Sequence, residues 1–255
     1  MTDEPIVPVE PRVPVESSAA AELPVAGIPV IAVDGPSGSG KGTVARMLAR
    51  RLGWHLLDSG ALYRIVGWVA LQRGIALDDV AGLARLVASL KIEFRDDPGS
   101  ELLHIDVDGV AVGDAIRTEQ VGEVASRVAQ IEAVRSGLLQ LQHRHRRPPG
   151  LIADGRDMGT VVFVDAALKI YLTASAEERA RRRYKQLIDK GFAASLPALI
   201  LSLEERDARD TERALSPLRP APDAVIIDSS AVSPAEVLAV VLNAMRQRGL
   251  GDTTG

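Results

Sequence analysis

The sequence predicts an α/β protein in which five parallel strands form one sheet with helices on both faces. Three observations support this prediction. Short runs of β-branched and apolar residues recur along the chain, stretches with helical spacing of apolar residues separate them, and several of the runs end at an aspartate. In such folds ligands bind beyond the carboxyl ends of the strands, so the polar strand ends are where function is to be sought.

The first strand and its helix are predicted within residues 28–53. Ile28 and residues 30–33 form a short apolar run, typical of a strand buried on both faces. A glycine-rich loop follows. Apolar residues then recur at helical spacing over 44–52, and Gly53 is the residue type that ends helices.

The later elements follow from the same patterns. Further strands are predicted at 54–57, 151–153, 168–172 and 225–228. Helices are predicted between Gly60 and Gly74, over 80–90, 118–130, 133–147 and 196–214, and after two capping boxes, Ser175 with Glu178 and Ser233 with Glu236.

Residues 91–112 differ from the rest of the chain. Apolar and polar residues alternate there around two turn signals, Asp-Pro-Gly at 97–99 and Asp-Gly at 108–109. We therefore expect a small antiparallel meander inserted into a chain that is otherwise rich in helices.

Composition narrows the class of protein. The chain has 255 residues, 46% of them hydrophobic, which is ample for one large domain with small insertions. Its net charge of −4 offers no basic field for nucleic acid, and the absence of cysteine excludes disulfides, cysteine zinc sites and thiol chemistry. No apolar run approaches the ~18 residues of a membrane span. We expect a cytoplasmic protein with no membrane or nucleic-acid partner.

The two ends are expected to lie outside the domain. Residues 1–26 are rich in proline and acidic residues and read as a disordered tail rather than a secretion signal. Residues 250–255 read as a short flexible tail, which leaves 27–249 as the folded domain.

The glycine-rich loop carries the most specific motif. Gly35, Gly40 and Lys41 match G-x-x-x-x-G-K, with a strand before and a helix after, as a phosphate-binding loop requires. Glycines let successive backbone N–H groups face phosphate oxygens, and the lysine adds a full charge near the β- and γ-phosphates. The predicted ATP-binding residues are Gly35, Pro36, Ser37, Gly38, Ser39, Gly40, Lys41, Gly42 and Thr43.

The motif departs from its usual form at one position. The Ser or Thr that ordinarily follows the lysine is Gly42, with Thr43 one residue later. No direct protein ligand for Mg²⁺ is therefore predicted. Thr43, Asp34 and Asp154 are the candidates to reach the ion through water.

Four further stretches identify a resemblance. WHLLDSGALYR (54–64), ASRVA (125–129), LIADGRDMGTVVF (151–163) and ERDARDTERA (205–214) follow the loop in the order found in bacterial cytidylate kinases. These are nucleoside monophosphate kinases of the P-loop class, and the resemblance covers about 28–249. It implies transfer of the γ-phosphoryl group of ATP to CMP or dCMP, with Mg²⁺. It also implies a core at 27–90 and 118–249, a monophosphate-binding insert at about 91–117, a lid at about 178–195 and a monomer.

The resemblance implies roles for acceptor-binding residues. Ser59 and Arg64 resemble residues that bind the acceptor nucleotide, and Arg156 resembles a residue that binds its phosphate. Asp157 suits the cytosine amine, because a carboxylate accepts from cytosine N4 whereas uracil presents a carbonyl there. Ser126 and Arg135 resemble contacts to the cytosine ring, although the residues alone favour an ordinary helix surface for this pair. For 58–64, the residues alone support equally well a capped helix with a solvated arginine.

Arg206, Arg209, Asp210 and Arg213 share one face of the predicted helix 196–214. A stripe of salt bridges is the simpler interpretation. The resemblance instead makes Arg206 and Arg213 phosphate-cleft arginines and Asp210 the ribose partner.

The basic segment 178–191 corresponds to the lid. Arg179, Arg182 and Arg183 are its candidates to reach the transferring phosphoryl group, and the predicted catalytic set is Lys41, Arg156, Arg182 and Arg183. An RNA-binding patch is disfavoured because Phe192 is the only aromatic residue in the rest of the lid.

Three other functions were weighed against this one. A GTPase needs an Asn-Lys-x-Asp box, and the only asparagine is Asn243, in VLNAM. A kinase of another small acceptor, such as UMP or AMP, is disfavoured only through the resemblance. A non-catalytic nucleotide sensor is disfavoured because no essential residue looks lost.

Overall fold

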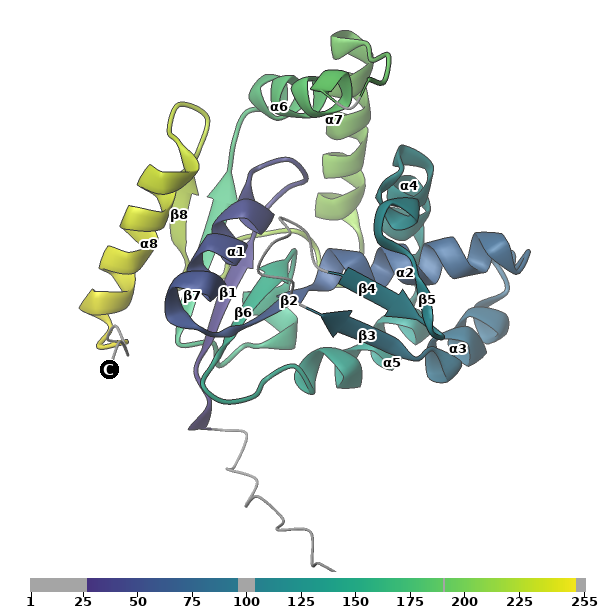
Figure 1. The fold of residues 1–255 in the computed structure, drawn as a ribbon, viewed down its shortest axis with the longest axis horizontal. Helices are drawn as coiled ribbons and strands as arrows, with labels where there is room; N and C mark the ends of the chain where they lie inside the picture. The colour runs from purple at the N-terminus through teal and green to yellow at the C-terminus, as the bar shows by residue number, and fades with distance from the viewer. Residues whose placement is uncertain (1–26, 96–103, 190, 251–255) are drawn as a thin grey trace, which may run out of the picture.

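The computed structural model describes residues 27–95, 104–189 and 191–250. Its main sheet has five strands, all parallel, in the order β2-β6-β1-β7-β8, as predicted (Figure 1). The strands are β1 (Val30–Asp34), β2 (His55–Asp58), β6 (Leu151–Gly155), β7 (Leu168–Thr173) and β8 (Val225–Asp228). The strand that precedes the glycine loop is therefore the central one.

The helices largely follow the predicted ranges. They are α1 (Lys41–Leu52), α2 (Ser59–Gln72), α3 (Val80–Ser89), α4 (Glu119–Val128), α5 (Glu132–His143), α6 (Ala176–Asp189), α7 (Leu196–Glu212) and α8 (Pro234–Gln247). Gly53 ends α1 in the left-handed conformation, with φ 64°. Ser233 and Glu236 form the predicted capping box of α8. Among these described elements, none is both long enough and apolar enough to cross a bilayer.

The two faces of the sheet carry separate cores. Successive side chains of β1 point to opposite faces, so Val30 and Ala32 pack with residues of α2 to α5, whereas Ile31 and Val33 pack with residues of α1 and α8. All four side chains are fully buried. Burial on both faces explains why this strand reads as a continuous apolar run.

The predicted meander is a separate antiparallel sheet of β3 (Ile92–Arg95), β4 (His104–Val107) and β5 (Val110–Ala111). Its second turn lies at Asp108 and Gly109, which both have positive φ. The first predicted turn, 97–99, lies outside the described residues. A short 3₁₀ helix, Gly113–Arg117, leads from this sheet to α4.

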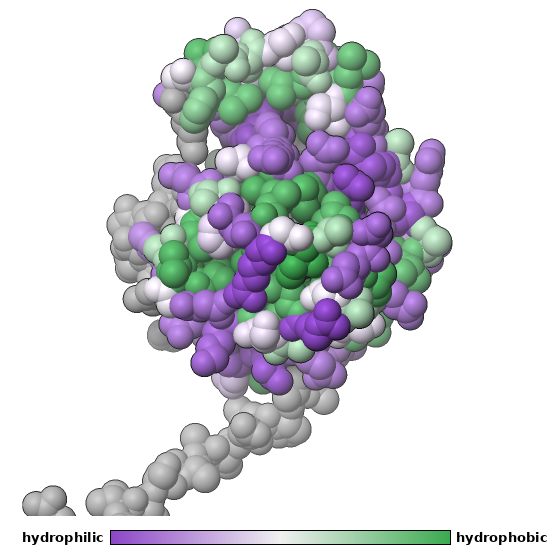
Figure 2. Space-filling model, turned by 90° about the vertical axis from the view of Figure 1, so that its right-hand side faces the viewer, coloured by the Kyte–Doolittle hydropathy of each residue, from purple (hydrophilic) through white to green (hydrophobic). Residues whose placement is uncertain are grey.

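Helices α6 and α7 project beyond the carboxyl ends of the strands (Figure 1). Seen from the side in Figure 2, this projection is largely apolar at its top, and hydrophilic side chains gather where it meets the body. Tyr184, Ile188, Phe192 and Leu201 are among its exposed apolar residues. The described residues of the segment expected to form the lid, 178–189 and 191–195, lie within this projection.

The predicted end of α5 was wrong. The helix was expected to reach residue 147, but it ends at His143. The chain turns there because Arg146 contacts residues outside the helix: its Nε donates to the Ile28 carbonyl at 2.8 Å, and its Nη1 pairs with Asp165 at 2.7 Å. These long-range contacts override the local helical pattern.

A π-helical turn, Met158–Val162, was not predicted. It follows β6 directly, and its first two N–H groups donate to the buried carboxylate of Asp34 at 2.9 and 2.8 Å. The acceptor lies more than a hundred residues away in the sequence, so no local pattern indicates the turn.

Candidate active site

The glycine loop links β1 to α1 at the carboxyl edge of the sheet. Gly35, Gly38 and Gly40 have φ of 152°, 81° and 89°, which L side chains rarely adopt. Helix α1 begins at Lys41 with no side-chain cap and no acidic residue in its first turn. Its first N–H groups and the positive end of its dipole are therefore left for an anion.

Lys41 is buried beneath the loop. Its ammonium donates to the carbonyl of Pro36 at 3.3 Å. Burial, together with the positive charge of Arg156, lowers the pKa of Lys41 to about 8, although Asp154 and Asp58 oppose the shift. In the same environment burial raises the pKa of Asp154 to about 6, against the attraction of Lys41. The ammonium is therefore mostly charged at neutral pH, but its pKa lies only slightly above that pH.

A pH dependence of substrate capture follows. Lys41 carries its charge below its pKa and loses it as the pH rises through about 8. If only the charged form captures the triphosphate, kcat/KM for ATP should be level near pH 7 and fall about tenfold per pH unit well above 8. A steady-state pH profile measures this. A profile level far into the alkaline range would contradict the lowered pKa.

The position of the departure, Gly42, lies against Asp154. A Cβ added there would lie 3.1 Å from Oδ2 of Asp154, a tight contact from which the carboxylate would have to shift slightly. The other oxygen, Oδ1, is buried and accepts no hydrogen bond. Asp154 therefore has a carboxylate oxygen without a hydrogen-bond partner beside the loop, and oxygen is the ligand type that Mg²⁺ prefers, so this residue fits the ion.

The other two candidates for the ion differ from Asp154. Both carboxylate oxygens of Asp34 already accept backbone N–H groups, and the side chain is buried. Thr43 is exposed and lines the cleft. No group of three His, Asp or Glu side chains gathers as a metal site in the part of the chain that the structure describes.

A cleft of about 630 Å³ opens beside the loop. It is bounded by the loop, by the ends of β6 and β8, and by α6 and α7. Its volume suits a small-molecule ligand. Predicted site residues that line it are Ser37, Gly38, Ser39, Gly40, Lys41, Gly42, Thr43, Arg64, Asp154, Arg156, Arg182, Arg183 and Arg206.

Arginines from several elements converge on this cleft, among them Arg64 of α2, Arg156 after β6 and Arg206 of α7. Arg64 of α2 donates to the carbonyls of Ile116 and Thr118 at 3.1 and 3.4 Å. A Cβ at Gly122 would lie within 3.5 Å of the guanidinium groups of both Arg64 and Arg206, so these two cations share one location. Burial and the charge of Arg156 lower the pKa of Arg206 to about 10. Several partly buried like charges favour an anionic ligand among them.

The remaining acceptor-side candidates form a second, buried cluster beside the cleft. Asp210 accepts from Arg156 Nε at 3.1 Å and from Ser126 Oγ at 3.4 Å. Arg135 pairs with Asp157 and lies over the ring of Tyr63 at 5.9 Å. Burial raises the pKa of Asp210, but the three arginines around it outweigh burial and lower it. The cluster brings Ser126, Arg135, Asp157 and Asp210 together from four segments.

The shared helix face predicted for 206–213 is correct only in part. Helix α7 ends at Glu212, and Arg213 follows it in extended conformation, with φ −59° and ψ 137°. There its Nε donates to the carbonyl of Ser216 at 2.5 Å, while Nη2 has no partner and is buried. The alternative interpretation, a stripe of salt bridges along the helix, is not what the described ion pairs of α7 form, because they run to other segments: Asp207 pairs with Arg179 of α6 at 2.5 Å, and Asp210 pairs with Arg156 after β6 at 3.1 Å.

Ser59 begins α2 at the end of β2. The carboxylate of Asp58 caps this helix by accepting from the N–H of Ala61 at 2.9 Å. Ser59 is buried, and a Cβ at Gly155 would lie 2.6 Å from its Oγ. Gly155 thus permits the close approach of the two strand ends.

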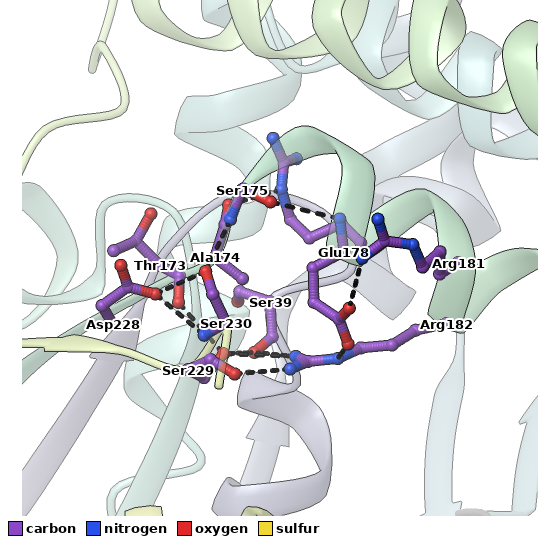
Figure 3. Close-up of polar contacts among 11 residues, drawn as sticks. Ser39, Thr173, Ala174, Ser175, Glu178, Arg181, Arg182, Asp228, Ser229 and Ser230 are labelled. Atoms are coloured by element: carbon purple, nitrogen blue, oxygen red, sulfur yellow. Dashed lines mark hydrogen bonds and ion pairs between the residues drawn. The ribbon is translucent and has the colours of Figure 1, made fainter. Parts of the chain in front are cut away.

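Two of the three arginines predicted for the lid, Arg179 and Arg182, hold the rim of the loop in this structure, and Figure 3 shows the contacts of Arg182. Arg182 donates to the carbonyl of Ser39 at 3.3 Å and to that of Ser229 at 2.5 Å. Arg183 reaches across to Glu119 of α4 at 2.5 Å. Arg179 is buried and donates to the carbonyls of Ser37 and Ala174.

The predicted capping box of α6 is only half formed. The N–H of Glu178 donates to Ser175 Oγ at 3.2 Å, as expected. Its carboxylate does not return to the cap; it accepts from Arg181 and Arg182 instead, at 3.3 and 3.0 Å (Figure 3). A nearby guanidinium is a stronger partner for a carboxylate than a backbone N–H.

Sequence reasoning missed Ser229. Its hydroxyl is buried and lies 2.9 and 3.0 Å from the carbonyl oxygens of Ser39 and Thr173, so its single proton can be donated to either, which ties β8 to the glycine loop and to β7 (Figure 3). The signal was present, because Asp-Ser-Ser at 228–230 follows a strand as Asp-Ser-Gly does at 58–60.

A parallel sheet with this loop at the end of its central strand places the chain among the P-loop proteins that bind nucleoside triphosphates. The family model described as cytidylate kinase matches residues 31–247. The chain belongs to the cytidylate kinase family.

Two relatives agree with this. A cytidylate kinase of Pseudomonas paraeruginosa is 53% identical over 224 residues, 88% of this chain and 98% of that one. A cytidylate kinase of Aeromonas salmonicida is 52% identical over 226 residues, 89% of this chain and 97% of that one. Among solved structures, TT1252 from Thermus thermophilus aligns with a TM-score of 0.44 at 21% identity, over 89% of this chain and 99% of that chain.

Proposed function

We propose that this chain transfers the γ-phosphoryl group of ATP to CMP or dCMP, giving ADP and CDP or dCDP. The observation that carries the proposal is the pairing of a phosphate-binding loop with a partly buried arginine cluster across one cleft. One side suits a triphosphate and the other a monophosphate. Membership of the cytidylate kinase family supplies the identity of the base.

The reaction needs no general base in this site. An oxygen of the acceptor phosphate is already an anion, and it forms a bond to the γ-phosphorus as the bond to the β–γ bridging oxygen breaks, leaving ADP. Lys41 and the loop N–H groups hold the donor phosphates. Arg156, Arg206 and Arg64 hold the acceptor phosphate in line and offset the repulsion between the two anions.

Mg²⁺ belongs to this proposal as the partner of ATP. Asp154, with its unpartnered buried oxygen, is the residue proposed to hold the ion's water shell, and Thr43 is exposed at the same edge of the cleft. When bound, the ion supplies charge neutralisation to the β- and γ-phosphates. Asp34 is proposed to have another task, described below.

Base selection is assigned to the buried cluster. Asp157 would accept from the cytosine amine, Arg135 and Ser126 would contact the ring, and Asp210 would bind the ribose hydroxyl. In this structure Arg135 pairs with Asp157 and Arg156 with Asp210. Binding of CMP would exchange these internal pairs for contacts to the substrate, so no charge is left without a partner.

The lid and the assembly complete the proposal. Arg182 and Arg183, together with α6, would move onto the phosphates and exclude water. We infer a monomer from membership of the cytidylate kinase family, whose folds close around the substrate without a partner.

The proposal is tested by ADP release from Mg-ATP with CMP, dCMP, UMP, AMP or no acceptor, on the unmodified chain and on Asp157→Ala. Fast turnover is expected with CMP and dCMP only. In the variant, the preference for CMP over UMP should fall about tenfold or more, as expected for loss of one carboxylate–amine contact. Equal turnover on UMP by the unmodified chain would overturn the role of Asp157. ADP release without acceptor would overturn the kinase assignment.

A further inference from the structure

The carboxylate of Asp34 connects the donor side of the site to the base-reading side. It stands at the end of β1, directly before the glycine loop, and is paired in register with Gly155 of β6. Its two oxygens accept from the N–H groups of Met158 and Gly159, at 2.9 and 2.8 Å. Both donors follow Asp157 immediately, at the start of the π-helical turn.

The position of Asp157 depends on this turn. The carbonyl of Asp157 accepts from the N–H groups of both Val161 and Val162, at 2.9 and 3.1 Å, which closes the turn on itself. The backbone of Asp157 has φ −144° and ψ 23°, so the chain changes direction there. Fixing the next two N–H groups therefore fixes where the Asp157 side chain points.

Keeping a carboxylate at position 34 has a cost. The side chain is buried beside the carboxylates of Asp154 and Asp157, and burial raises its pKa to about 7 in spite of the two N–H donors. A buried carboxyl group beside two others is costly, and its hydrogen bonds offset part of that cost. The bonds made here are to two adjacent N–H groups, which needs two acceptor oxygens on one side chain.

We propose that Asp34 is a positioning residue for acceptor selection: by holding the turn after β6 it places Asp157 for the base, rather than binding the metal ion. The inference rests on the proposed function. In this proposal β1, the strand that precedes the phosphate-binding loop, also supports the turn at 158–162 and through it Asp157. The donor and acceptor sides are thereby set relative to each other by one side chain.

The test compares Asp34→Asn with the unmodified chain. Asparagine has the same shape but one acceptor oxygen, so one of the two N–H groups is left facing an amide NH₂. The ratio of kcat/KM for CMP to that for UMP should fall about tenfold, through KM for CMP, while KM for ATP and the Mg²⁺ requirement stay unchanged. By amide exchange in NMR spectra, Met158 or Gly159 should lose protection while other sheet amides keep it.

A double-mutant cycle shows whether the effect acts through Asp157. In Asp157→Ala the selectivity is already reduced, so adding Asp34→Asn should lower it little further. Asp79→Ala is the matched control, because Asp79 also accepts a backbone N–H, from Gly82 at 2.8 Å, but caps α3 away from the cleft. That variant should lose stability and keep its selectivity.

The outcomes separate the two proposals. An unmodified chain that does not phosphorylate CMP overturns the proposed function. If it does phosphorylate CMP, an Asp34→Asn variant with unchanged selectivity, or one whose losses simply add to those of Asp157→Ala, overturns the positioning role. Activity restored by raised Mg²⁺ would also overturn it, since that result marks a metal ligand.

Discussion

Replacing Lys41 by methionine should lower kcat/KM for phosphoryl transfer by about 10²- to 10³-fold and leave the chain folded. The ammonium is the cation that the glycine loop itself brings to the donor phosphates, and it is buried where an electrostatic interaction is strong. Loss of one preorganised charge aimed at a transferring group has an effect of this size. The measurement is steady-state turnover with saturating and limiting ATP.

Stability distinguishes a catalytic loss from unfolding in this variant. Methionine fills a similar volume without a buried charge, so the free energy of unfolding should change by no more than about 1 kcal/mol. Asp154 loses a counter-charge, but its pKa is already raised to about 6, so it can take up a proton near neutrality. Lys91→Met, at an exposed position, is the control and should keep full activity. A loss below about tenfold in Lys41→Met would remove Lys41 from the catalytic set.

Replacing Gly35 by alanine should destabilise the chain by roughly 3 kcal/mol or more and abolish binding of ATP. A Cβ at this position would lie 2.0 Å from the carbonyl oxygen of Leu172, an atom of the β7 backbone that cannot rotate away. The residue also has φ 152°. Relief requires β1, the loop or β7 to shift, and such overpacking at a strained position belongs to the large class of destabilising effects.

Gly113→Ala is the matched control for this substitution. No heavy atom lies within 4 Å of an added Cβ at Gly113, so the free energy of unfolding should stay within about 0.5 kcal/mol of the unmodified chain. Urea unfolding and calorimetric titration with an ATP analogue measure the two effects separately. Full stability of Gly35→Ala would mean that the loop tolerates another path.

The sequence was sufficient for the elements whose pattern is local. The five strands read as apolar runs because the sheet is covered on both faces, and Gly53 ended α1 as its residue type predicted. Many cleft-lining residues could also be predicted from the sequence. Parallel strands bring their carboxyl ends to one edge of the sheet, so the motifs at 35–43, 58–64 and 154–159 were expected to lie close together.

What the sequence could not provide depends on partners far along the chain. The turn at 158–162 is held by hydrogen bonds to Asp34. Beyond the end of α5, Arg146 donates to the carbonyl of Ile28. The carboxylate of Glu178 accepts from Arg182 instead of completing the capping box. Ser229 was missed for another reason: the polar strand-end signal that identified Ser59 was not applied to β8. The roles of the individual site residues remain predictions for the experiments above.

The strand order also bears on how the site comes into being during synthesis. Strand β1 emerges first, yet both its neighbours, β6 and β7, lie beyond residue 150. The loop-bearing strand must therefore wait unpaired while most of the chain is made, and closure of so long a segment slows folding. A nascent chain arrested before Leu168 has no β7 against which to seat Gly35, so we expect nucleotide capture to begin only late in translation, with the whole sheet assembling at once.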